Sequence, residues 1–229
     1  MKLILESWKE FLSEDFSKIE SIIDRLGDRA VSVETSGPGM ISISFVNQNL
    51  DNSKGGAAHP VGILNMHKAK SDEGNCLNAW VISYSLADKG YGPLLYDVAI
   101  EMASKDSKSF GLTPDRTNLS ADAFKVWEKY LTIRPDVEKV QLDDLENSLT
   151  PDAEDNCDPD SATNHAPFPS LLSLFSDKDE EEYNKNFAKY LKGSAVMKVY
   201  SKKSTPTYNK LVSVGKLFMD GEKILEIEP

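Results

Sequence analysis

The spacing of hydrophobic residues in the middle of the chain changes at a pair of glycines. Residues 80–84 are almost all apolar and lack the alternation of a one-sided strand, so both faces of this stretch are expected to be covered. Gly90 and Gly92 follow within a few residues. Apolar residues then recur at helical spacing for three turns, with Asp97 and Glu101 outside the apolar stripe. The pattern predicts a central strand, a tight glycine turn and an amphipathic helix.

The first third of the chain carries the signals of a helical segment, a hairpin and a further strand. Apolar residues at helical spacing between residues 5 and 26 predict one broken helix or two short ones, and Gly27 ends the pattern. Two alternating stretches, 31–35 and 41–45, flank a turn built from glycine and proline and predict a hairpin. A polar loop then precedes a strand that is expected at 61–66.

The last half of the chain combines further helix and strand signals with one clear turn signal. Small polar residues mark helix starts, proline follows one of them at the first helical position, and an Asp-Gly pair indicates a two-residue hairpin. The expected elements are a short strand at 110–112, a helix beginning at Asn118 or Ser120 and ending at 134–136, a strand at 137–142, a helix over 183–191, a strand at 195–201, a helix from Pro206 to Gly215 and a hairpin about Asp220-Gly221.

The glycine turn before the central helix has two interpretations. The first turn of a helix presents unpaired N–H groups and the positive end of the helix dipole, and glycines allow an anion such as a phosphate to approach closely. Alternatively, the turn only requires a positive φ at Gly90 or Gly92. The spacing matches neither the dinucleotide-binding fingerprint nor the P-loop.

The composition of the chain excludes several classes of protein function. The chain has 229 residues and a formal net charge of −11, which argues against a general nucleic-acid-binding protein because such proteins present a basic face to phosphate. The two cysteines and three histidines show no metal-binding spacing, and no apolar run is long enough to span a membrane. A reducing cytoplasm is the expected environment. The stretch 143–177 contains no Lys or Arg and is predicted to be a solvent-exposed surface loop, with an acidic binding segment as the alternative.

The order of elements, with ADKGYG at Ala87–Gly92, resembles the GNAT N-acetyltransferase superfamily over roughly residues 29–144. The resemblance implies an α/β fold built on a mixed α+β sheet, here with an acidic insertion and a C-terminal β-hairpin. It also implies a pyrophosphate loop that binds acetyl-CoA. The family usually has Arg or Gln where this chain has Ala87, and Lys89 is either a replacement charge or a solvent-facing loop residue. The implied cofactor-binding residues are Ser85, Ala87, Lys89, Gly90, Tyr91 and Gly92.

Longer stretches are similar to a GNAT-like group encoded by tailed bacteriophages. They include SYSLADKGYGPLLYDVAIEMA, LTPDRTNLSADAFKVWEKYL and the distal AVMKVYSKK. The start of the chain, 1–12, is similar to leaders of phage proteins packaged into the head, with Ile4-Leu5-Glu6 in the form of a prohead-protease site. Its alternative is a first helix that covers the core. The expected organisation is a helical segment at 1–28, a GNAT-like core at 29–144, an acidic and helical insertion at 145–194, and a strand, helix and hairpin at 195–229 that complete the domain.

The resemblance also implies a mechanism, in which a substrate amine attacks the acetyl thioester directly. A backbone N–H where the central strand bulges, near Ser85 to Ala87, would stabilise the oxyanion, and an acid would protonate the leaving thiolate. In that family the acid is usually a tyrosine in the helix that follows the short strand. Trp127 stands at the usual position, so Tyr130, one turn later, is the candidate acid, with a core role as its alternative. No single base stands out. The candidates are an Asp115–Arg116 pair, Glu34, Asp88 and the acids near Asp143.

Two functions are therefore expected from the sequence. The first is an acetyl-CoA-dependent N-acetyltransferase that acts on a small amine or a host protein in the host cytoplasm. The second is a catalytically inactive GNAT-fold phage protein that serves as a virion-packaged or host-directed binding protein. Saturable binding of acetyl-CoA followed by acetyl transfer separates the first function from the second.

Overall fold

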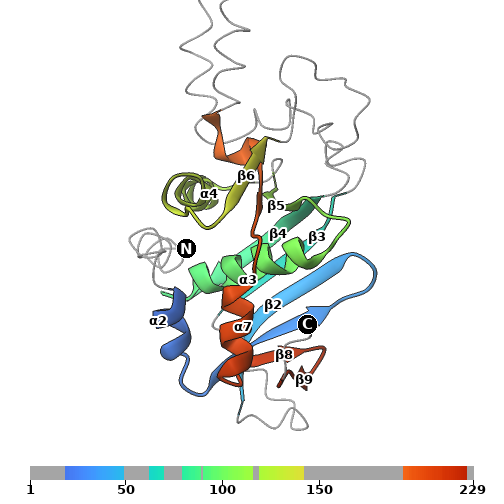
Figure 1. Cartoon of the computed structure of the whole chain (residues 1–229), viewed down its shortest axis with the longest axis vertical. Helices are drawn as coiled ribbons and strands as arrows, with labels where there is room; N and C mark the ends of the chain where they lie inside the picture. Colours follow the sequence, from blue (N-terminus) through green and yellow to red (C-terminus); the bar gives the residue numbers. More distant parts are fainter. Residues whose placement is uncertain are drawn as a thin grey trace, which may run out of the picture.

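The computed structural model describes residues 19–48, 62–69, 79–88, 90–115, 119–141 and 193–225 (Figure 1). In these residues a nine-stranded mixed sheet is combined with four α-helices, which confirms the predicted mixed α/β class. In chain order the elements are α2 (Ile19–Asp24), β1 (Arg29–Thr35), β2 (Met40–Asn47), β3 (Gly62–Lys68), β4 (Ala79–Ala87), α3 (Gly92–Lys105), β5 (Gly111–Pro114), α4 (Ala121–Ile133), β6 (Glu138–Gln141), the 3-10 helix η3 (Ala195–Met197), β7 (Lys198–Ser201), α7 (Pro206–Ser213), β8 (Leu217–Met219) and β9 (Glu222–Lys223). The strand order in the sheet is β6-β7-β5-β4-β3-β2-β1-β8-β9.

The first half of the sheet is antiparallel and follows the predicted hairpin. β1 pairs with β2 from Arg29 opposite Asn47 to Thr35 opposite Ile41. Gly37 and Gly39 in the connecting turn both have φ of +79°, which glycine adopts at no steric cost. β3 continues the antiparallel order between β2 and β4. The predicted hairpin and the predicted strand after it are both confirmed.

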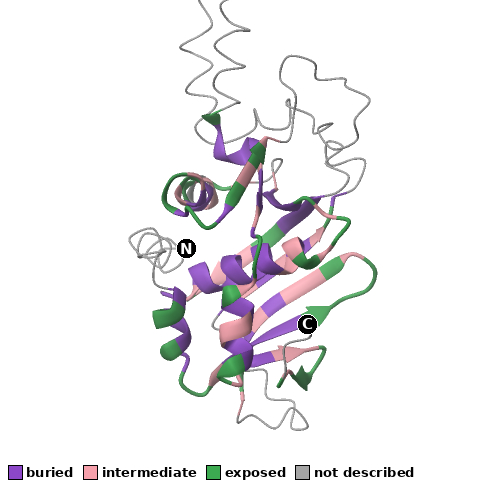
Figure 2. Ribbon diagram, in the orientation of Figure 1, coloured by how far each residue is buried: buried purple, intermediate pink, exposed green. Residues whose placement is uncertain are grey.

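Helix α3 lies across one face of this sheet and is the most deeply buried of the described helices (Figures 1 and 2). Its sheet-facing side packs so closely on β3 that a Cβ at Gly62 would come within 3.0 Å of the Leu95 side chain. Eleven of its 14 residues are buried, including Asp97 and Glu101. These two acids lie outside the predicted apolar stripe and are nevertheless buried, because α7 and the end of β7 cover the outer side of α3.

The second half of the sheet begins with a parallel pair. β4 pairs with β5 from Ala79 opposite Gly111 to Ile82 opposite Pro114. Gly111 has φ of +128°, and a Cβ there would lie 2.3 Å from the Tyr200 carbonyl oxygen, so the close approach of β7 to β5 requires glycine.

The C-terminal segments extend the sheet at two separate places. β7 lies between β5 and β6, and β8 pairs parallel to β1 before turning back as β9. Asp220 and Gly221 both have positive φ, which confirms the predicted two-residue turn. The strand predicted at 195–201 is shorter than expected. Ala195–Met197 form the 3-10 helix, whose first turn is capped when Ser194 Oγ accepts a hydrogen bond from Val196 N.

Several predicted segments lie outside the described residues, namely the first helical stretch up to residue 18, the acidic stretch 143–177 and the helix at 183–191. Among the helices that the structure does describe, none is both long enough and apolar enough to cross a membrane.

Candidate functional site

The two parallel strands at the centre of the sheet separate after four residue pairs. β5 ends at Pro114, whereas β4 continues for five residues beyond Ile82. The pairing of β3 with β4 shifts at the same point, because Asn65 pairs with Tyr84 and Met66 with Ile82, which leaves Ser83 as the extra residue of a β-bulge. The carboxyl end of β4 is therefore free of a strand partner on its β5 side in the described chain.

A pocket of about 170 Å³ lies where the strands separate, and we call it the fork pocket. It is bounded by the end of β4, the first half of α3, the start of α4 and the residue that follows β5. Side chains that matter for its chemistry include Ile82, Ser83, Ser85, Tyr96, Asp115 and Trp127.

A pair of hydroxyl groups lies in the fork pocket. Ser85 Oγ is 3.0 Å from Tyr96 Oη, so β4 and α3 are joined by one hydrogen bond. The Tyr96 ring is held by an edge contact with Trp127, with ring centroids 5.6 Å apart. Burial raises the pKa of Tyr96 to about 12, although the hydrogen bond with Ser85 acts in the opposite direction. Tyr96 is therefore neutral at any physiological pH, and either of the two hydroxyls can be the donor in this pair.

The glycine turn connects the end of β4 to α3. Gly90 has φ of +89°, as one of the two sequence interpretations required, and α3 begins at Gly92. The N-cap residue is Tyr91, which makes no side-chain cap, and the first turn of α3 carries no acidic residue. The positive end of the helix dipole is therefore not neutralised by a side chain of its own first turn.

The predicted cofactor-binding residues lie in different parts of the structure. Ser85 lies in the fork pocket, and Ala87 is the last residue of β4, paired with Gly62. The Tyr91 side chain points away from the fork toward α2 and the hairpin, because its hydroxyl donates to Arg25 O at 3.3 Å and the Arg29 guanidinium lies 5.1 Å from its ring centroid. Gly90 and Gly92 form the turn, and Lys89 lies outside the described residues.

Tyr130, the predicted acid, is placed elsewhere. Its side chain is completely buried on α4, and its hydroxyl donates to Asp97 Oδ1 at 3.0 Å. Burial and the neighbouring Asp97 charge raise its pKa well above the ordinary value. The structure brings Ser85, Tyr96 and Trp127 together at the fork, and it directs the Tyr130 hydroxyl toward a different group of residues.

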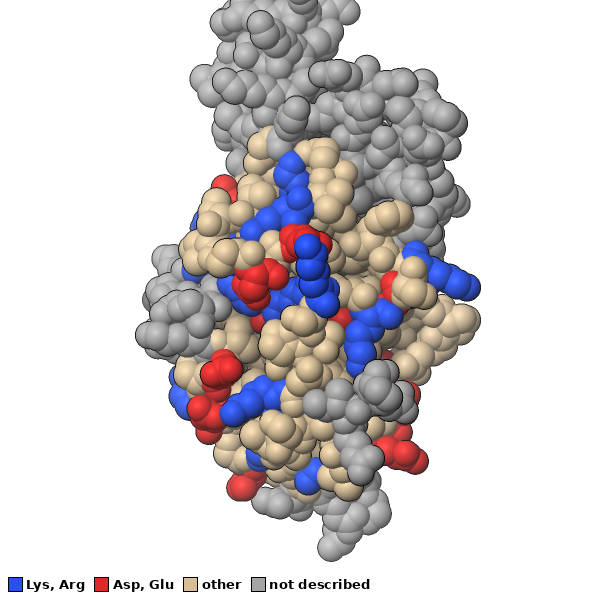
Figure 3. All heavy atoms as spheres, viewed as in Figure 1, with Lys and Arg blue, Asp and Glu red and all other residues tan. Residues whose placement is uncertain are grey.

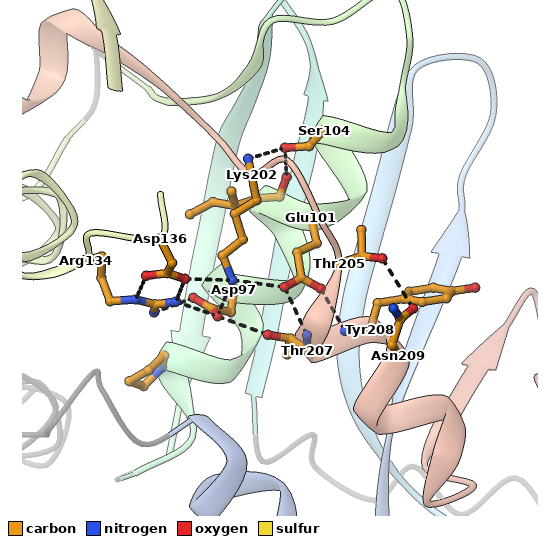
Figure 4. Close-up of polar contacts among 12 residues, drawn as sticks. Asp97, Glu101, Ser104, Arg134, Asp136, Lys202, Thr205, Thr207, Tyr208 and Asn209 are labelled. Carbon is orange, nitrogen blue, oxygen red and sulfur yellow. Dashed lines mark hydrogen bonds and ion pairs between the residues drawn. The ribbon is translucent and has the colours of Figure 1, made fainter. Parts of the chain in front are cut away.

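That group is a set of five charged side chains, which we call the charge cluster (Figure 4). Four of them are buried, namely Asp97, Glu101, Arg134 and Lys202, and the fifth, Asp136, is exposed. Asp97 receives two parallel hydrogen bonds from the Arg134 guanidinium, at 2.7 and 3.0 Å, and a third from Lys202 Nζ at 2.7 Å. Asp97, Glu101 and Lys202 are almost fully buried. Helix α3, the end of α4 and the end of β7 are thereby joined through paired charges.

Glu101 also caps helix α7. It accepts hydrogen bonds from the backbone N–H groups of Thr207 and Tyr208, at 3.1 and 2.7 Å, while Lys202 Nζ contacts the same carboxylate at 2.9 Å. Helix α7 has no side-chain cap of its own, so an acid from another helix satisfies its first turn.

The pKa values in the charge cluster follow from burial and pairing. Burial raises the pKa of Glu101 despite its contact with Lys202. Burial acts to lower the pKa of Lys202, but the charges of Asp97 and Glu101 outweigh it and hold that pKa above its ordinary value. Hydrogen bonds from Arg134 lower the pKa of Asp136 to about 2. All five groups are thus bound to partners of opposite charge within the cluster.

A larger cavity of about 620 Å³ borders the charge cluster, between α2, the end of α4 and the start of α7. Acidic and basic side chains alternate over this face of the molecule (Figure 3). The cluster's cations contact the carboxylates of the cluster itself, so this cavity is best described as the edge of an internal framework.

The GNAT resemblance implied Ser85, whereas the sequence analysis did not select Tyr96. Tyr96 is buried on α3, and its hydroxyl lies 3.0 Å from Ser85 Oγ on the part of β4 that extends past β5. The signal was present in the sequence as a tyrosine in the first turns of the helix that follows the glycine pair.

No family model matches the sequence, and no match was found among the curated proteins or the solved structures compared with it.

Proposed function

We propose that the protein is an acetyl-CoA-dependent N-acetyltransferase of the GNAT type, with the fork pocket as the place of acyl transfer. The observation that carries the proposal is the sequence of features along one segment: a bulged central strand that loses its parallel neighbour, a glycine turn with positive φ, and a helix start without acidic residues. The GNAT resemblance expects a bulge and a pyrophosphate loop in this order.

The residues present suit a phosphorylated thioester. Gly90 and Gly92 shape a helix start that favours negative charge, so the pyrophosphate would lie there. The edge of β4 at residues 83–87 has no strand partner on its β5 side in the described chain and would hydrogen-bond the amide groups of the pantetheine arm. Bound acetyl-CoA supplies an activated acetyl group. The protein would orient that group at the bulge, where a backbone N–H stabilises developing negative charge.

Calorimetry with acetyl-CoA and with CoA tests this function. Saturable binding is expected for the wild type, and Gly90→Ala should weaken it because a side chain is strained at φ of +89°. Gly27→Ala is the matched control. It introduces the same kind of strain at φ of +57°, in open space and away from the fork.

Thiol release from acetyl-CoA, measured with butylamine, spermidine and lysine methyl ester as acceptors, tests the transfer itself. The proposal is refuted when neither acetyl-CoA nor CoA binds saturably to the wild type.

The position of Tyr130 favours a second function, a GNAT-fold phage protein that binds without catalysing transfer. Its hydroxyl is held by Asp97, and Trp127 lines the pocket where the resemblance expects a tyrosine. This function predicts no amine-dependent thiol release. Its virion-packaged form also predicts that the chain is present in purified virions.

A further inference from the structure

We propose that Ser85 is a catalytic residue that donates its hydroxyl proton to the leaving sulfur, and that Tyr96 is the positioning residue that holds Ser85 for this step. The inference rests on the proposed acetyl transfer and deepens it. It gives the role of the acid to a pair of residues on β4 and α3 in place of the predicted Tyr130.

The geometry at the fork selects this pair. Ser85 lies two residues beyond the bulged Ser83, on the part of β4 that extends past β5, and its Oγ is 3.0 Å from Tyr96 Oη. The Tyr96 ring is buried and fixed against Trp127. Either hydroxyl of this pair can be the donor. When Tyr96 donates, the Ser85 proton is left to point into the pocket.

The other serines that line the pocket have different roles. Ser120 Oγ caps helix α4 by accepting from Ala123 N at 3.1 Å. Ser83 Oγ donates to the backbone carbonyl of Asn65 at 3.3 Å.

The proton transfer does not require an ionised tyrosine. The amine nitrogen bonds to the carbonyl carbon, the carbon–sulfur bond breaks with its electron pair on sulfur, and sulfur takes the Ser85 proton. Ser85 takes a proton from the amine nitrogen as it gives up its own, so no serine alkoxide forms and the products are an amide and a thiol. An alkyl thiol ionises near pH ~8.5, well below the Tyr96 pKa of about 12. Tyr96 therefore keeps its proton and contributes a hydrogen bond.

Four variants test the roles. Ser85→Ala should lower kcat by about 100-fold with little change in KM for acetyl-CoA, because the lost proton donor acts on the leaving group. Ser85→Thr keeps the hydroxyl and should recover much of the rate. Tyr96→Phe should lower kcat by about 10-fold. The double variant should be no slower than Ser85→Ala alone, since Tyr96 acts through Ser85.

Matched controls come from hydroxyls outside the fork. Ser213→Ala removes an exposed serine hydroxyl that donates to Lys210 O, and Tyr208→Phe removes a phenol whose oxygen contacts Met219 Sδ. Both should retain the wild-type kcat.

A binding measurement provides a readout that does not depend on turnover. Calorimetry should show CoA binding more tightly to the wild type at pH 9.5 than at pH 7, because Ser85 donates to the thiolate. Ser85→Ala should lose this gain, and desulfo-CoA, which has no thiol, should bind both proteins equally.

The inference is overturned when wild type transfers acetyl groups and Ser85→Ala stays within 3-fold of it, which leaves the proposed function standing. It is also overturned when CoA and desulfo-CoA bind with the same pH dependence. Absence of any CoA binding to the wild type removes both proposals together.

Discussion

Replacing Lys202 by methionine removes the cation that joins Asp97 to Glu101 at the centre of the charge cluster. The lysine side chain is 2% exposed and contacts the two carboxylates at 2.7 and 2.9 Å. Methionine has a similar length and volume, so the change deletes charge and hydrogen bonds while leaving the packing nearly intact.

The expected loss of unfolding free energy is about 3 kcal/mol. Removing one partner of a buried ion pair costs about 3–5 kcal/mol, because the remaining charge is left buried. Here the cost should lie near the lower limit, since Arg134 still pairs with Asp97 and two backbone N–H groups of α7 still bond Glu101. In a chain of 229 residues this corresponds to a fall in Tm of about 6–12 °C.

The loss should depend on pH in a defined direction. Burial already raises the pKa of Glu101, and loss of Lys202 raises it further. A carboxyl with a raised folded-state pKa contributes stability below its unfolded value of 4.5, and that stability is lost as the pH rises through the folded pKa. Lys202→Met should therefore be more destabilising at pH 8 than at pH 5. Adding Glu101→Gln should recover part of the loss at pH 8.

Urea unfolding monitored by tryptophan fluorescence measures these differences. Lys203→Met is the matched control, because Lys203 pairs with Glu138 at 2.9 Å on the surface and its side chain is 84% exposed. It should unfold at the wild-type urea concentration. The reasoning is refuted if Lys202→Met unfolds together with the Lys203→Met control, or if its loss is larger at pH 5 than at pH 8.

Three further predictions concern stability. Because the pKa of Asp136 is lowered to about 2, its contribution to folding stability is present above pH 3.8 and is lost as the pH falls through 2. Asp136→Asn should therefore make the urea midpoint of unfolding depend less on pH between pH 4 and pH 2, and an unchanged pH dependence contradicts this. Gly111→Ala should destabilise by more than about 3 kcal/mol, because its Cβ would lie 2.3 Å from the Tyr200 carbonyl oxygen, whereas Gly193→Ala, with open space, should be tolerated; equal melting temperatures would refute this. Acetyl-CoA at 100 times its Kd should stabilise the wild type by about 2.7 kcal/mol in thermal unfolding, and no shift at saturating ligand would contradict it.

Much of the fold follows from local signals in the sequence. The change from a continuous apolar run to helical spacing located β4 and α3, and the glycine and Asp-Gly turns located both hairpins. Ser120 was one of the two expected starts of α4, and its hydroxyl does cap that helix. These features depend on neighbouring residues, so a single sequence contains the information.

The charge cluster was missed because its partners are distant in the chain. Asp97 pairs with Arg134 and Lys202, which lie 37 and 105 residues away. An acid on a helix is normally expected to face solvent, and only the second layer formed by α7 and the end of β7 places Asp97 and Glu101 inside.

The candidate site was predictable only in part. The glycine turn could be placed because the end of a central strand is recognisable from its apolar pattern, and Ser85 was implied by the GNAT resemblance. The contact of Tyr96 with Ser85 could not be predicted, because a β-bulge changes which side chains face α3 beyond it, and nothing in the alternation of residues marks the bulge. Tyr130 was selected by its position along α4, which does not reveal that Asp97 and Arg134 are its neighbours.

Hydrogen exchange followed by mass spectrometry, with and without acetyl-CoA, tests the location of binding most directly. Acetyl-CoA should slow exchange in the peptides covering residues 83–96, where β4 lacks its β5 neighbour and α3 begins. The peptides that border the larger cavity, at 206–210, should be unaffected. Protection confined to 206–210, or binding that leaves 83–96 unchanged, would contradict the assignment of the fork pocket.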